Sequence, residues 1–289
     1  MKKQIVYELS LNIHSTNQRR IEMAYGFFVG MGTKLSDIVE TKKGAKTRLS
    51  VYLPHLAKAN VLRRKLLVHS FPKRIISLKR FKDEDWKTRW KDDFKPFALT
   101  KHIQVVPAWL KDDYQDRRRR PLYLDSSLAF GTGLHETTRY TAQLIESLQG
   151  KFKSFLDLGT GTGILTIVAL FCGAEEFRAI DISDDAVQTA KKNLARNNYP
   201  DKTVRTMDIA TFKSRQPFDL VAANLLTKDL IAYGRRIIYL VKPNQYLAVS
   251  GISRENFTLL RRAFKKLPLR CLKVRKGKKW VAVLYKRSK

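Results

Sequence analysis

Acidic residues are scarce in this sequence, and the scarcity is concentrated at its two ends. The 289 residues contain 57 Lys and Arg against 26 Asp and Glu, which gives a formal net charge of +31 at pH 7. Residues 1–80 carry 17 basic and 4 acidic side chains, and residues 251–289 carry 14 and 1. This asymmetry favours an acidic macromolecular partner, with RNA or a ribonucleoprotein first. A general gain in solubility is the alternative explanation.

Long apolar runs and cysteine clusters are also missing. No apolar run approaches 18 residues, and the first residues lack the apolar stretch of a signal peptide. We therefore expect a soluble, cytoplasmic protein with no membrane partner. Cys172 and Cys271 lie far apart, and neither has a Cys or His neighbour at metal-ligand spacing. We expect both to be reduced core residues, and no metal site.

The first 80 residues alternate strand and helix signals in the order βαββαβ. Strands are expected at 4–13, 35–40, 47–53 and 75–81, and helices from 16 or 17 to 28 and over 54–70. The turn at 42–44 joins the second and third strands as a hairpin. This order predicts a ferredoxin-like α+β domain over residues 1–81. Because that fold hosts many unrelated functions, it indicates no chemistry.

Residues 82–97 form a separate segment in which acids, bases and aromatic residues are mixed. Trp86 and Trp90 are four residues apart, a spacing that places both indoles on one face of a helix. Pro96 marks the end of that helix. We therefore predict a linker helix over 82–97, followed by a larger domain over 98–289 that begins with a strand at 103–106.

From residue 136 onwards, helix and strand signals alternate regularly. Strands are expected at 154–158, 176–182, 203–207, 218–224, 245–250, 269–275 and 280–285, and helices from about 136 and at 163–172, 183–197, 227–240 and 255–266. This order predicts an α/β fold with a doubly wound, Rossmann-like, seven-stranded sheet that ends in a hairpin. Ligands of such sheets bind outside the carboxyl ends of the strands.

A glycine motif stands at the end of the first of these seven strands. Residues 156–163 read Leu-Asp-Leu-Gly-Thr-Gly-Thr-Gly, and Gly159, Gly161 and Gly163 allow a sharp turn in which backbone amides approach a ligand. A dinucleotide motif needs its third glycine one position later, where this chain has Ile164. Asp181, at the end of the next strand, suits two ribose hydroxyls. The spacing therefore favours S-adenosylmethionine over NAD.

Polar residues at these strand ends suit the remaining groups of S-adenosylmethionine. We expect Asp157 to hold the methionine ammonium, the amides of 159–163 to face its carboxylate, and Asp208 to accept from the adenine amine. The same motifs place further candidates beside them: Thr160, Ile182, Ile209 and Asn224. A charge-assisted hydrogen bond contributes about 1.5–3 kcal/mol, so loss of Asp181 should weaken cofactor binding at least about tenfold. Capping of helices or turns is the alternative role, chiefly for Asp208.

A second dense motif precedes the glycine motif. Residues 129–138 read Ala-Phe-Gly-Thr-Gly-Leu-His-Glu-Thr-Thr. Together with 156–163, with Ala-Ile-Asp-Ile at 179–182, with Ala-Asn-Leu-Leu at 223–226 and with Ser-Gly-Ile at 250–252, this motif resembles the PrmA family of class I methyltransferases. Its members methylate ribosomal protein L11 of the large subunit. The resemblance covers about residues 82–285, and covers the first 80 only through strand order.

The resemblance implies roles for individual residues. Those that would line the cofactor and methyl-transfer site are Phe130, Gly131, Thr132, Gly133, His135, Thr137, Thr138, Asp157, Gly159, Gly161, Asp181, Asp208 and Asn224. Among them, Asn224, His135 and Phe130 are the catalytic candidates, with Asn224 placed towards the target nitrogen. The first domain would bind the protein substrate, and the Trp86/Trp90 helix would set its orientation. The expected reaction transfers methyl from the sulfonium to a neutral amine without a strong base or a metal.

Three features depart from the family pattern, and three other functions stay open. The family often has proline after the motif histidine, where this chain has Glu136, and the run Arg117–Arg120 and the basic tail exceed what the family predicts. The alternatives are an RNA methyltransferase acting on rRNA, a methyltransferase of a non-ribosomal protein lysine, and a ribosome-assembly binding protein without turnover. We expect a monomer whose basic ends can contact rRNA.

Overall fold

The structure is a computed structural model and describes residues 5–33, 38–69, 71–82, 95–125 and 133–289. The chain divides into two compact units, Met1–Lys95 and Pro96–Lys289. The expected linker helix with Trp86 and Trp90 falls on 83–94, outside the described residues. Phe130, Gly131 and Thr132 of the second motif also lie outside them.

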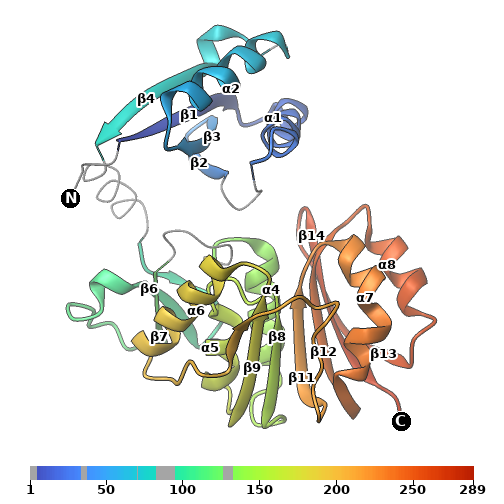
Figure 1. Ribbon diagram of the computed structural model, residues 1–289. Coiled ribbons are helices and arrows are strands. Elements are labelled where there is room, and N and C mark those ends of the chain that lie inside the picture. The colour runs from blue at the N-terminus through green and yellow to red at the C-terminus, as the bar shows by residue number, and fades with distance from the viewer. Residues whose placement is uncertain (1–4, 34–37, 70, 83–94, 126–132) are drawn as a thin grey trace. The chain divides into compact units, whose positions relative to one another are not determined.

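The first unit is a four-stranded antiparallel sheet with two helices (Figure 1). Its elements are β1 (Ile5–His14), α1 (Gln18–Gly30), β2 (Val39–Lys43), β3 (Lys46–Leu53), α2 (Leu56–Val68), the short turn η2 (Lys73–Ile75) and β4 (Ile76–Lys82). The strand order β2-β3-β1-β4 is the ferredoxin-like arrangement that was predicted. Alternate residues of β1, Leu9 and Leu11, are buried against Phe28 of α1 and Leu66 of α2, because strand side chains alternate between faces.

The larger unit is built on a seven-stranded sheet. Its strands are β8 (Ser154–Leu158), β9 (Glu176–Asp181), β10 (Val204–Thr206), β11 (Phe218–Asn224), β12 (Val241–Ser253), β13 (Leu269–Lys276) and β14 (Trp280–Arg287). They lie in the order β10-β9-β8-β11-β12-β14-β13. The strands from β10 to β12 are parallel, and β14 runs antiparallel to β12 and β13. All seven predicted strands and the closing hairpin are therefore confirmed.

Helices cover both faces of this sheet (Figure 1). They are α4 (Glu136–Glu146), α5 (Ile164–Phe171), α6 (Asp184–Arg196), α7 (Thr227–Tyr239) and α8 (Phe257–Phe264). Leu230 of α7 and Phe264 of α8 join Val221, Val249 and Val283 in one buried core. On the other face, α4 packs against β11, β12, β14 and α5. This arrangement leaves the carboxyl ends of the parallel strands available for a ligand.

Several features differ from the prediction. In the first unit, β2 continues to Lys43, whereas a strand at 35–40 and a turn at 42–44 were expected. A small sheet of β5 (Phe97–Ala98), β6 (Ile103–Pro107) and β7 (Arg120–Leu124) precedes α4, with the turn η3 (Ala108–Leu110) after β6. Only β6 was predicted, because β7 begins in the arginine run and contains Pro121, which suits an edge strand. Strand β12 starts at Val241 rather than 245. Cys172 is buried as expected, but Cys271 is exposed on β13, so its assignment to the core was wrong.

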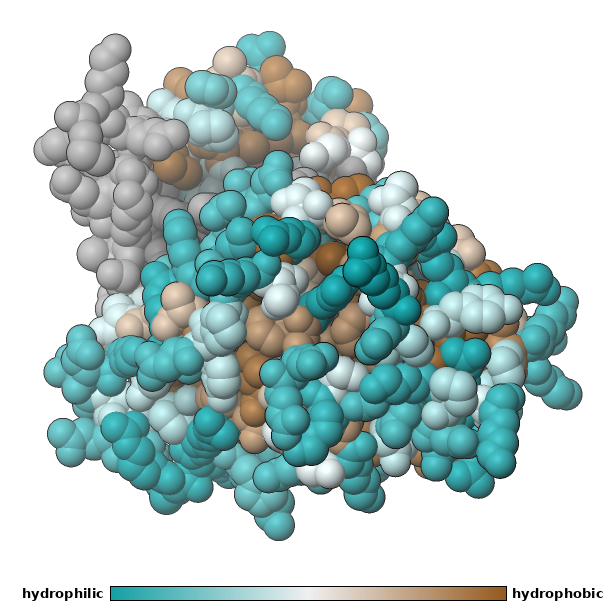
Figure 2. All heavy atoms as spheres, turned by 60° about the horizontal axis from the view of Figure 1, so that its bottom comes forward, coloured by the Kyte–Doolittle hydropathy of each residue, from teal (hydrophilic) through white to brown (hydrophobic). Residues whose placement is uncertain are grey.

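The surface agrees with the composition. Hydrophilic side chains cover most of the face seen in Figure 2, and hydrophobic ones show between them.

Candidate active site

Polar residues at the carboxyl ends of four adjacent strands gather at one edge of the large sheet. Asp181 and Asn224 are the last residues of β9 and β11, and Asp157 is the last but one of β8. Asp208 follows β10 by two residues. Because β10, β9, β8 and β11 are parallel neighbours, these ends lie side by side. The predicted convergence of the four residues is present in the structure.

The glycine loop between β8 and α5 has a backbone that favours glycine. The φ angles of Gly159, Gly161 and Gly163 are +76°, +55° and +79°, a region that other residues rarely adopt. A Cβ on Gly159 would lie 2.7 Å from Cδ2 of Leu225, and one on Gly163 would lie 3.1 Å from Cβ of Ala190. The glycines therefore permit both the turn and its close packing.

The amides of this loop are used inside the protein. Those of Gly159 and Thr160 donate to the carbonyl oxygen of Ile180, at 2.9 and 3.0 Å. The amide of Gly161 donates to Oδ2 of Asp181, and that of Gly163 to the carbonyl oxygen of Thr160, both at 2.9 Å. The expectation that the amides of 159–163 face a ligand carboxylate is therefore corrected for these four, because each already has an acceptor.

Asp157 is the most deeply buried acid of the site. Its Oδ2 accepts hydrogen bonds from the hydroxyls of Thr160 and Thr166, at 2.9 and 2.8 Å. Its Oδ1 is also buried and has no hydrogen-bond partner among the described residues. Burial raises the pKa of Asp157 to about 6, although the two threonine hydroxyls oppose the shift. An unpaired buried carboxylate oxygen calls for a donor, and a cationic one stabilises it most.

Asp181 lies between the glycine loop and α6. Its Oδ2 accepts from the Gly161 amide, and its Oδ1 accepts from the Ser183 amide at 3.0 Å. Each carboxylate oxygen has two acceptor positions, so the side chain can still accept from two hydroxyls. The next side chain, Ile182, is 74% exposed. An exposed isoleucine at this edge offers an apolar surface to a flat ring such as adenine.

Asp208 caps a turn. Its Oδ1 accepts from the Ala210 amide at 2.8 Å, and its carbonyl oxygen accepts from the Thr211 amide at 3.1 Å. The capping role considered for this residue is therefore present. Among the described residues, no hydrogen bond to its Oδ2 is recorded, so one oxygen stays available for a ligand amine. The adjacent Ile209 packs against the core beneath the site.

Asn224 is tied to the start of α4. Its Nδ2 lies 3.3 Å from Oγ1 of Thr137 and 3.5 Å from Oγ1 of Thr138. The hydroxyl of a threonine can donate or accept, so either orientation of the amide satisfies these contacts. Both threonines are 1% exposed. The structure thus brings Asn224 to Thr137 and Thr138, which precede it by 87 and 86 residues in the sequence.

His135 is the N-cap of α4. Its Nδ1 accepts from the Thr137 amide at 3.4 Å and lies 2.8 Å from the hydroxyl of the same residue. The ring packs edge-on against Trp280, with centroids 5.1 Å apart. Gly133, two residues earlier, has a φ of +84°, and a Cβ there would meet Ile164 at 3.0 Å. His135 therefore orders the helix start, which is a structural role.

Glu136 points towards the turn between β13 and β14. A Cβ on Gly277 would lie 2.7 Å from Oε2 of Glu136 and 2.3 Å from the hydroxyl of Tyr140. That Oε2 is buried without a hydrogen-bond partner among the described residues. Burial and then the Glu136 charge raise the pKa of Tyr140. Glu136, which stands where the family often has proline, therefore lies against the hairpin of β13 and β14.

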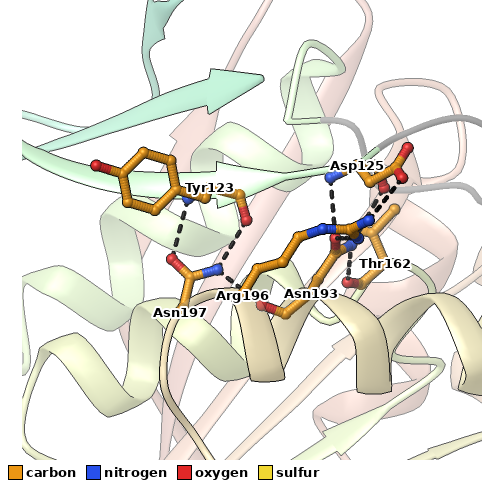
Figure 3. Close-up of polar contacts among 6 residues, drawn as sticks. All are labelled: Tyr123, Asp125, Thr162, Asn193, Arg196 and Asn197. Atoms are coloured by element: carbon orange, nitrogen blue, oxygen red, sulfur yellow. Dashed lines mark hydrogen bonds and ion pairs between the residues drawn. The ribbon is translucent and has the colours of Figure 1, made fainter. Parts of the chain in front are cut away.

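Asn193 of α6 joins the two segments that flank the cofactor site, and this residue was not predicted from the sequence. Its Nδ2 donates to the carbonyl oxygens of Thr162 and Asp125, at 2.9 and 3.2 Å. Its Oδ1 accepts from the Asp125 amide at 2.9 Å. Figure 3 shows this amide between the two segments, with Arg196 on the Asp125 carboxylate and Asn197 on the backbone of Tyr123. The only signal in the sequence was a polar residue on the buried face of a helix.

Gly251 is a second residue that was missed as a site residue. It lies in β12 with a φ of +81°, and a Cβ there would come within 2.0 Å of the carbonyl oxygen of Leu225. Leu225 directly follows Asn224, and its amide donates to the carbonyl oxygen of Ser250 at 3.2 Å. Gly251 therefore sets the path of the backbone beyond Asn224.

These residues fit S-adenosylmethionine. The observation that tests the fit is the buried, unpaired Oδ1 of Asp157, which needs a donor such as the methionine ammonium. The remaining candidates, Asp181 and Asp208, each keep acceptor capacity at the same sheet edge. Among the described residues, no group of three or more His, Cys, Asp or Glu is arranged to hold a metal ion.

Comparisons with known proteins agree with the motifs. The sequence model of the family described as ribosomal protein L11 methyltransferase (PrmA) matches residues 28–288. A ribosomal protein L11 methyltransferase from Pelobacter propionicus is 35% identical over 226 residues, which cover 76% of this chain and 71% of that protein. One from Ruminiclostridium cellulolyticum is 33% identical over 207 residues, which cover 71% of this chain and 65% of that protein. The matched parts thus span about two thirds of these relatives.

A solved structure is similar as well. The crystal structure of ribosomal protein L11 methylase from Lactobacillus delbrueckii subsp. bulgaricus matches with a TM-score of 0.62 and 28% identity, over 68% of this chain and 100% of that chain. The expected fold and family are therefore confirmed, and with them a methyltransferase that uses S-adenosylmethionine. The protein belongs to the ribosomal protein L11 methyltransferase family, PrmA.

Proposed function

We propose that this protein transfers methyl groups from S-adenosylmethionine to amine nitrogens of ribosomal protein L11, on lysine side chains, on the N-terminal amine, or on both. The observation that carries the proposal is the position of Asn224. It places an uncharged amide at the end of β11, next to β8 with Asp157 and one strand away from β9, which ends in Asp181. The cofactor, when bound, supplies an electrophilic methyl group on a sulfonium.

An uncharged side chain suits this reaction because the attacking amine must be neutral. A lysine with a pKa near 10.4 is about three units from neutrality at pH 7.4, so its free base costs roughly 4 kcal/mol. A carboxylate beside the amine would raise that cost by stabilising the ammonium. Asn224 can accept from the amine through its Oδ1 and orient the lone pair towards the methyl group. Holding both groups in line supplies much of the acceleration.

The remaining site residues support Asn224. Thr137 and Thr138 hold its amide, and His135 caps the helix that carries both. Asp157 holds the ammonium of the cofactor, Asp181 its ribose hydroxyls and Asp208 its adenine amine. Ile182 contacts the adenine ring. In this assignment the acids bind the cofactor and none of them touches the acceptor amine.

The proposal extends to partners and location. The first unit binds the protein substrate, and the enzyme acts as a monomer in the cytoplasm, where its basic ends contact rRNA. The positive charge of residues 1–80 and 251–289 supports the contact with RNA. Among the described residues, no helix is long and apolar enough to cross a membrane.

The decisive experiment incubates the purified protein with S-adenosylmethionine labelled on its methyl group, unmodified L11 and ribosomal RNA. We expect label on L11, and none with a variant that combines His135→Ala and Asp181→Ala. Asp185→Asn is the matched control, because Asp185 is an exposed acid at the start of α6. Label on RNA would favour an RNA methyltransferase instead. Absence of label from both would overturn the proposal.

A further inference from the structure

The closing hairpin of the larger unit carries a cationic surface that methyl transfer does not use. From Asn256 to the C-terminus the sequence contains no Asp or Glu. Five cations on β13 and the turn after it are exposed: Arg270, Lys273, Lys276, Lys278 and Lys279. Within the described ranges, none of them forms an ion pair. We name these five side chains the edge patch.

Strand β13 is open on its outer edge and on much of both faces. It is the last strand of the sheet, and its apolar residues Leu272 and Val274 are 40% and 36% exposed. Lysines on an edge strand oppose pairing with a further strand. The edge patch is therefore poorly suited to add a strand from a partner protein, and its charge suits a polyanion.

The strand register arranges the cations in line with aromatic rings. Arg270 lies opposite Lys286 of β14, which lies opposite Tyr246 of β12, so all three share one face. The Nζ of Lys286 is 5.9 Å from the centre of the Tyr246 ring. Lys273 lies on the same face. It pairs with Leu284, and Leu284 shares a face with Lys286 because the two are two residues apart on β14. A row of cations beside an aromatic ring is the arrangement that binds nucleic-acid backbones and bases.

The opposite face of β13 repeats this combination. Lys276 lies with its Nζ 5.4 Å from the centre of the Phe257 ring of α8. Arg261, one turn along α8, lies 5.9 Å from the same ring. Both faces of the edge strand thus combine unpaired cations with an aromatic ring.

The edge patch adjoins the methyl-transfer site. The turn that contains Lys278 and Lys279 leads directly into Trp280, which packs on His135. Gly277 in the same turn lies against Glu136. A polyanion at this end of the edge patch would therefore lie next to the start of α4, the helix that carries Thr137 and Thr138.

The arginine run 117–120 of the same unit differs from the edge patch, because its side chains have partners within the protein. The guanidinium of Arg120 stacks on Phe171 at 3.6 Å, and that of Arg118 pairs with Asp116 at 2.9 Å. Arg119 donates to the carbonyl oxygen of Lys101 at 3.2 Å. These side chains support local structure, whereas the five side chains of the edge patch form no ion pair in the described part of the chain, and Lys276 contacts only the Phe257 ring among aromatic partners.

We propose that the edge patch binds the phosphate backbone of RNA next to the protein substrate, so that the enzyme recognises L11 together with the RNA to which it is attached. Arg270, Lys273 and Lys276 contact phosphates, and Tyr246 and Phe257 contact bases. The inference rests on the proposed function for the identity of the substrate. RNA binding itself needs no methyl transfer and is measured separately.

The test measures binding of a fluorescein-labelled, 20-nucleotide single-stranded RNA to the full chain at several salt concentrations. The edge variant combines Arg270→Glu, Lys273→Glu and Lys276→Glu. The control variant combines Arg178→Glu, Lys202→Glu and Arg205→Glu, which are exposed cations on β9, just before β10 and on β10, at the opposite end of the sheet. Both variants change the net charge equally. The second readout is methylation of free L11 and of L11 bound to its rRNA fragment.

We expect the edge variant to bind RNA at least about tenfold more weakly than the control variant, with a salt slope reduced by about two. Its KM should rise for RNA-bound L11 and stay unchanged for free L11. Equal weakening by both variants would overturn the inference, because net charge alone would explain it. Salt-independent binding of the unaltered protein would do so too. Failure to methylate free L11 would overturn the proposed function and leave the RNA result standing.

Discussion

The side-chain amide of Asn193 donates a hydrogen bond of 2.9 Å to the carbonyl oxygen of Thr162 in the glycine loop. The same side chain bonds to the backbone amide and carbonyl of Asp125, at the end of β7. Asn193 is 0% exposed, so no water replaces these bonds when one is lost. A single buried residue thus connects the glycine loop to the chain that leads into the 129–138 motif.

This connection makes Asn193 a positioning residue for cofactor binding. We expect Asn193→Ala to lower the free energy of unfolding by about 2–3 kcal/mol, because it leaves buried backbone groups unpaired. Affinity for S-adenosylmethionine should fall about tenfold, since a loop displaced by a fraction of an ångström no longer fits the ligand. Urea unfolding and isothermal titration calorimetry measure the two effects.

Asn197→Ala is the matched control for that experiment. Asn197 lies one turn further along α6, and its amide bonds to the backbone of Tyr123 at 3.0 and 2.7 Å. It has no hydrogen bond to the glycine loop among the described residues. Stability should therefore fall, with cofactor affinity unchanged. An equal loss of affinity in both variants would mean that Asn193 acts only through stability.

The buried carboxyl of Asp157 should make cofactor affinity depend on pH. Its pKa is raised to about 6, so it is protonated in the free enzyme below that pH. An ammonium binds the ionised form, and we expect affinity to fall about tenfold for each unit below pH 6. Calorimetry between pH 5 and 8 measures this. Asp157→Asn should bind weakly at every pH, and a persisting pH dependence in that variant would exclude Asp157 as its source.

The same shift predicts an effect on stability. The folded-state pKa of Asp157 lies above the ordinary value of 3.8 for an aspartate, so the folded protein binds more protons between about pH 4 and 6. Its contribution is therefore neutral below pH 4 and becomes destabilising as the pH rises through 6. We expect Asp157→Asn to have a free energy of unfolding at pH 7.5 that is about 1 kcal/mol or more above that of the unaltered protein. At pH 4 the two free energies should be equal. Urea unfolding at both pH values measures the difference.

Asn224 is expected to affect the rate of methyl transfer and not the affinity for the cofactor. Asn224→Asp adds a negative charge that holds the proton on the acceptor amine. We expect kcat for L11 to fall about a hundredfold at pH 7.5, and cofactor affinity to stay within about threefold. Raising the pH to 9.5 should restore part of the loss, because the amine then deprotonates more easily. A variant with unchanged kcat would remove Asn224 from the methyl-transfer step.

Gly251 should be essential for the backbone path beside Asn224. Gly251→Ala would place a methyl group 2.0 Å from the carbonyl oxygen of Leu225, so that segment must shift. We expect kcat to fall about a hundredfold. The control is Gly150→Ala, where φ is +73° and no atom lies within 4 Å of the added Cβ. It should lose only about 1–2 kcal/mol of stability to backbone strain, with normal kcat.

Much of the architecture was predictable because its signals are local. The strands at 154–158 and 218–224 were placed correctly because each is an apolar run bounded by turn residues, a pattern that depends on nearby residues alone. Strand β7 was missed because its pairing with β6 depends on residues 17 positions away, and its own residues include Arg120 and Pro121. The start of β12 was missed because 242–245, with Lys-Pro-Asn-Gln, has the composition of a turn.

The candidate site divides in the same way. Asp157, Asp181 and Asn224 were predicted, since parallel strands bring their carboxyl ends to one edge and each residue stands at such an end. The hydrogen bonds of Asn224 to Thr137 and Thr138 and those of Asn193 to Thr162 were not predictable, because they join different helices and strands. The hydrogen bonds of the glycine-loop amides were not predictable either, because two of their acceptors, Ile180 and Asp181, belong to the neighbouring strand β9.

The sequence alone determined the family, the two-unit order of elements, the cofactor class and the charge at both ends, because motif spacing, periodicity and composition are properties of the linear chain. Only the tertiary structure decided which atoms are left unpaired and which are satisfied. It buried Oδ1 of Asp157 without a partner, gave the amides of the glycine loop internal acceptors, and exposed Arg270 and Lys273 on an edge strand. Burial and hydrogen bonding depend on contacts between distant segments, and these exist only when the sheet has formed.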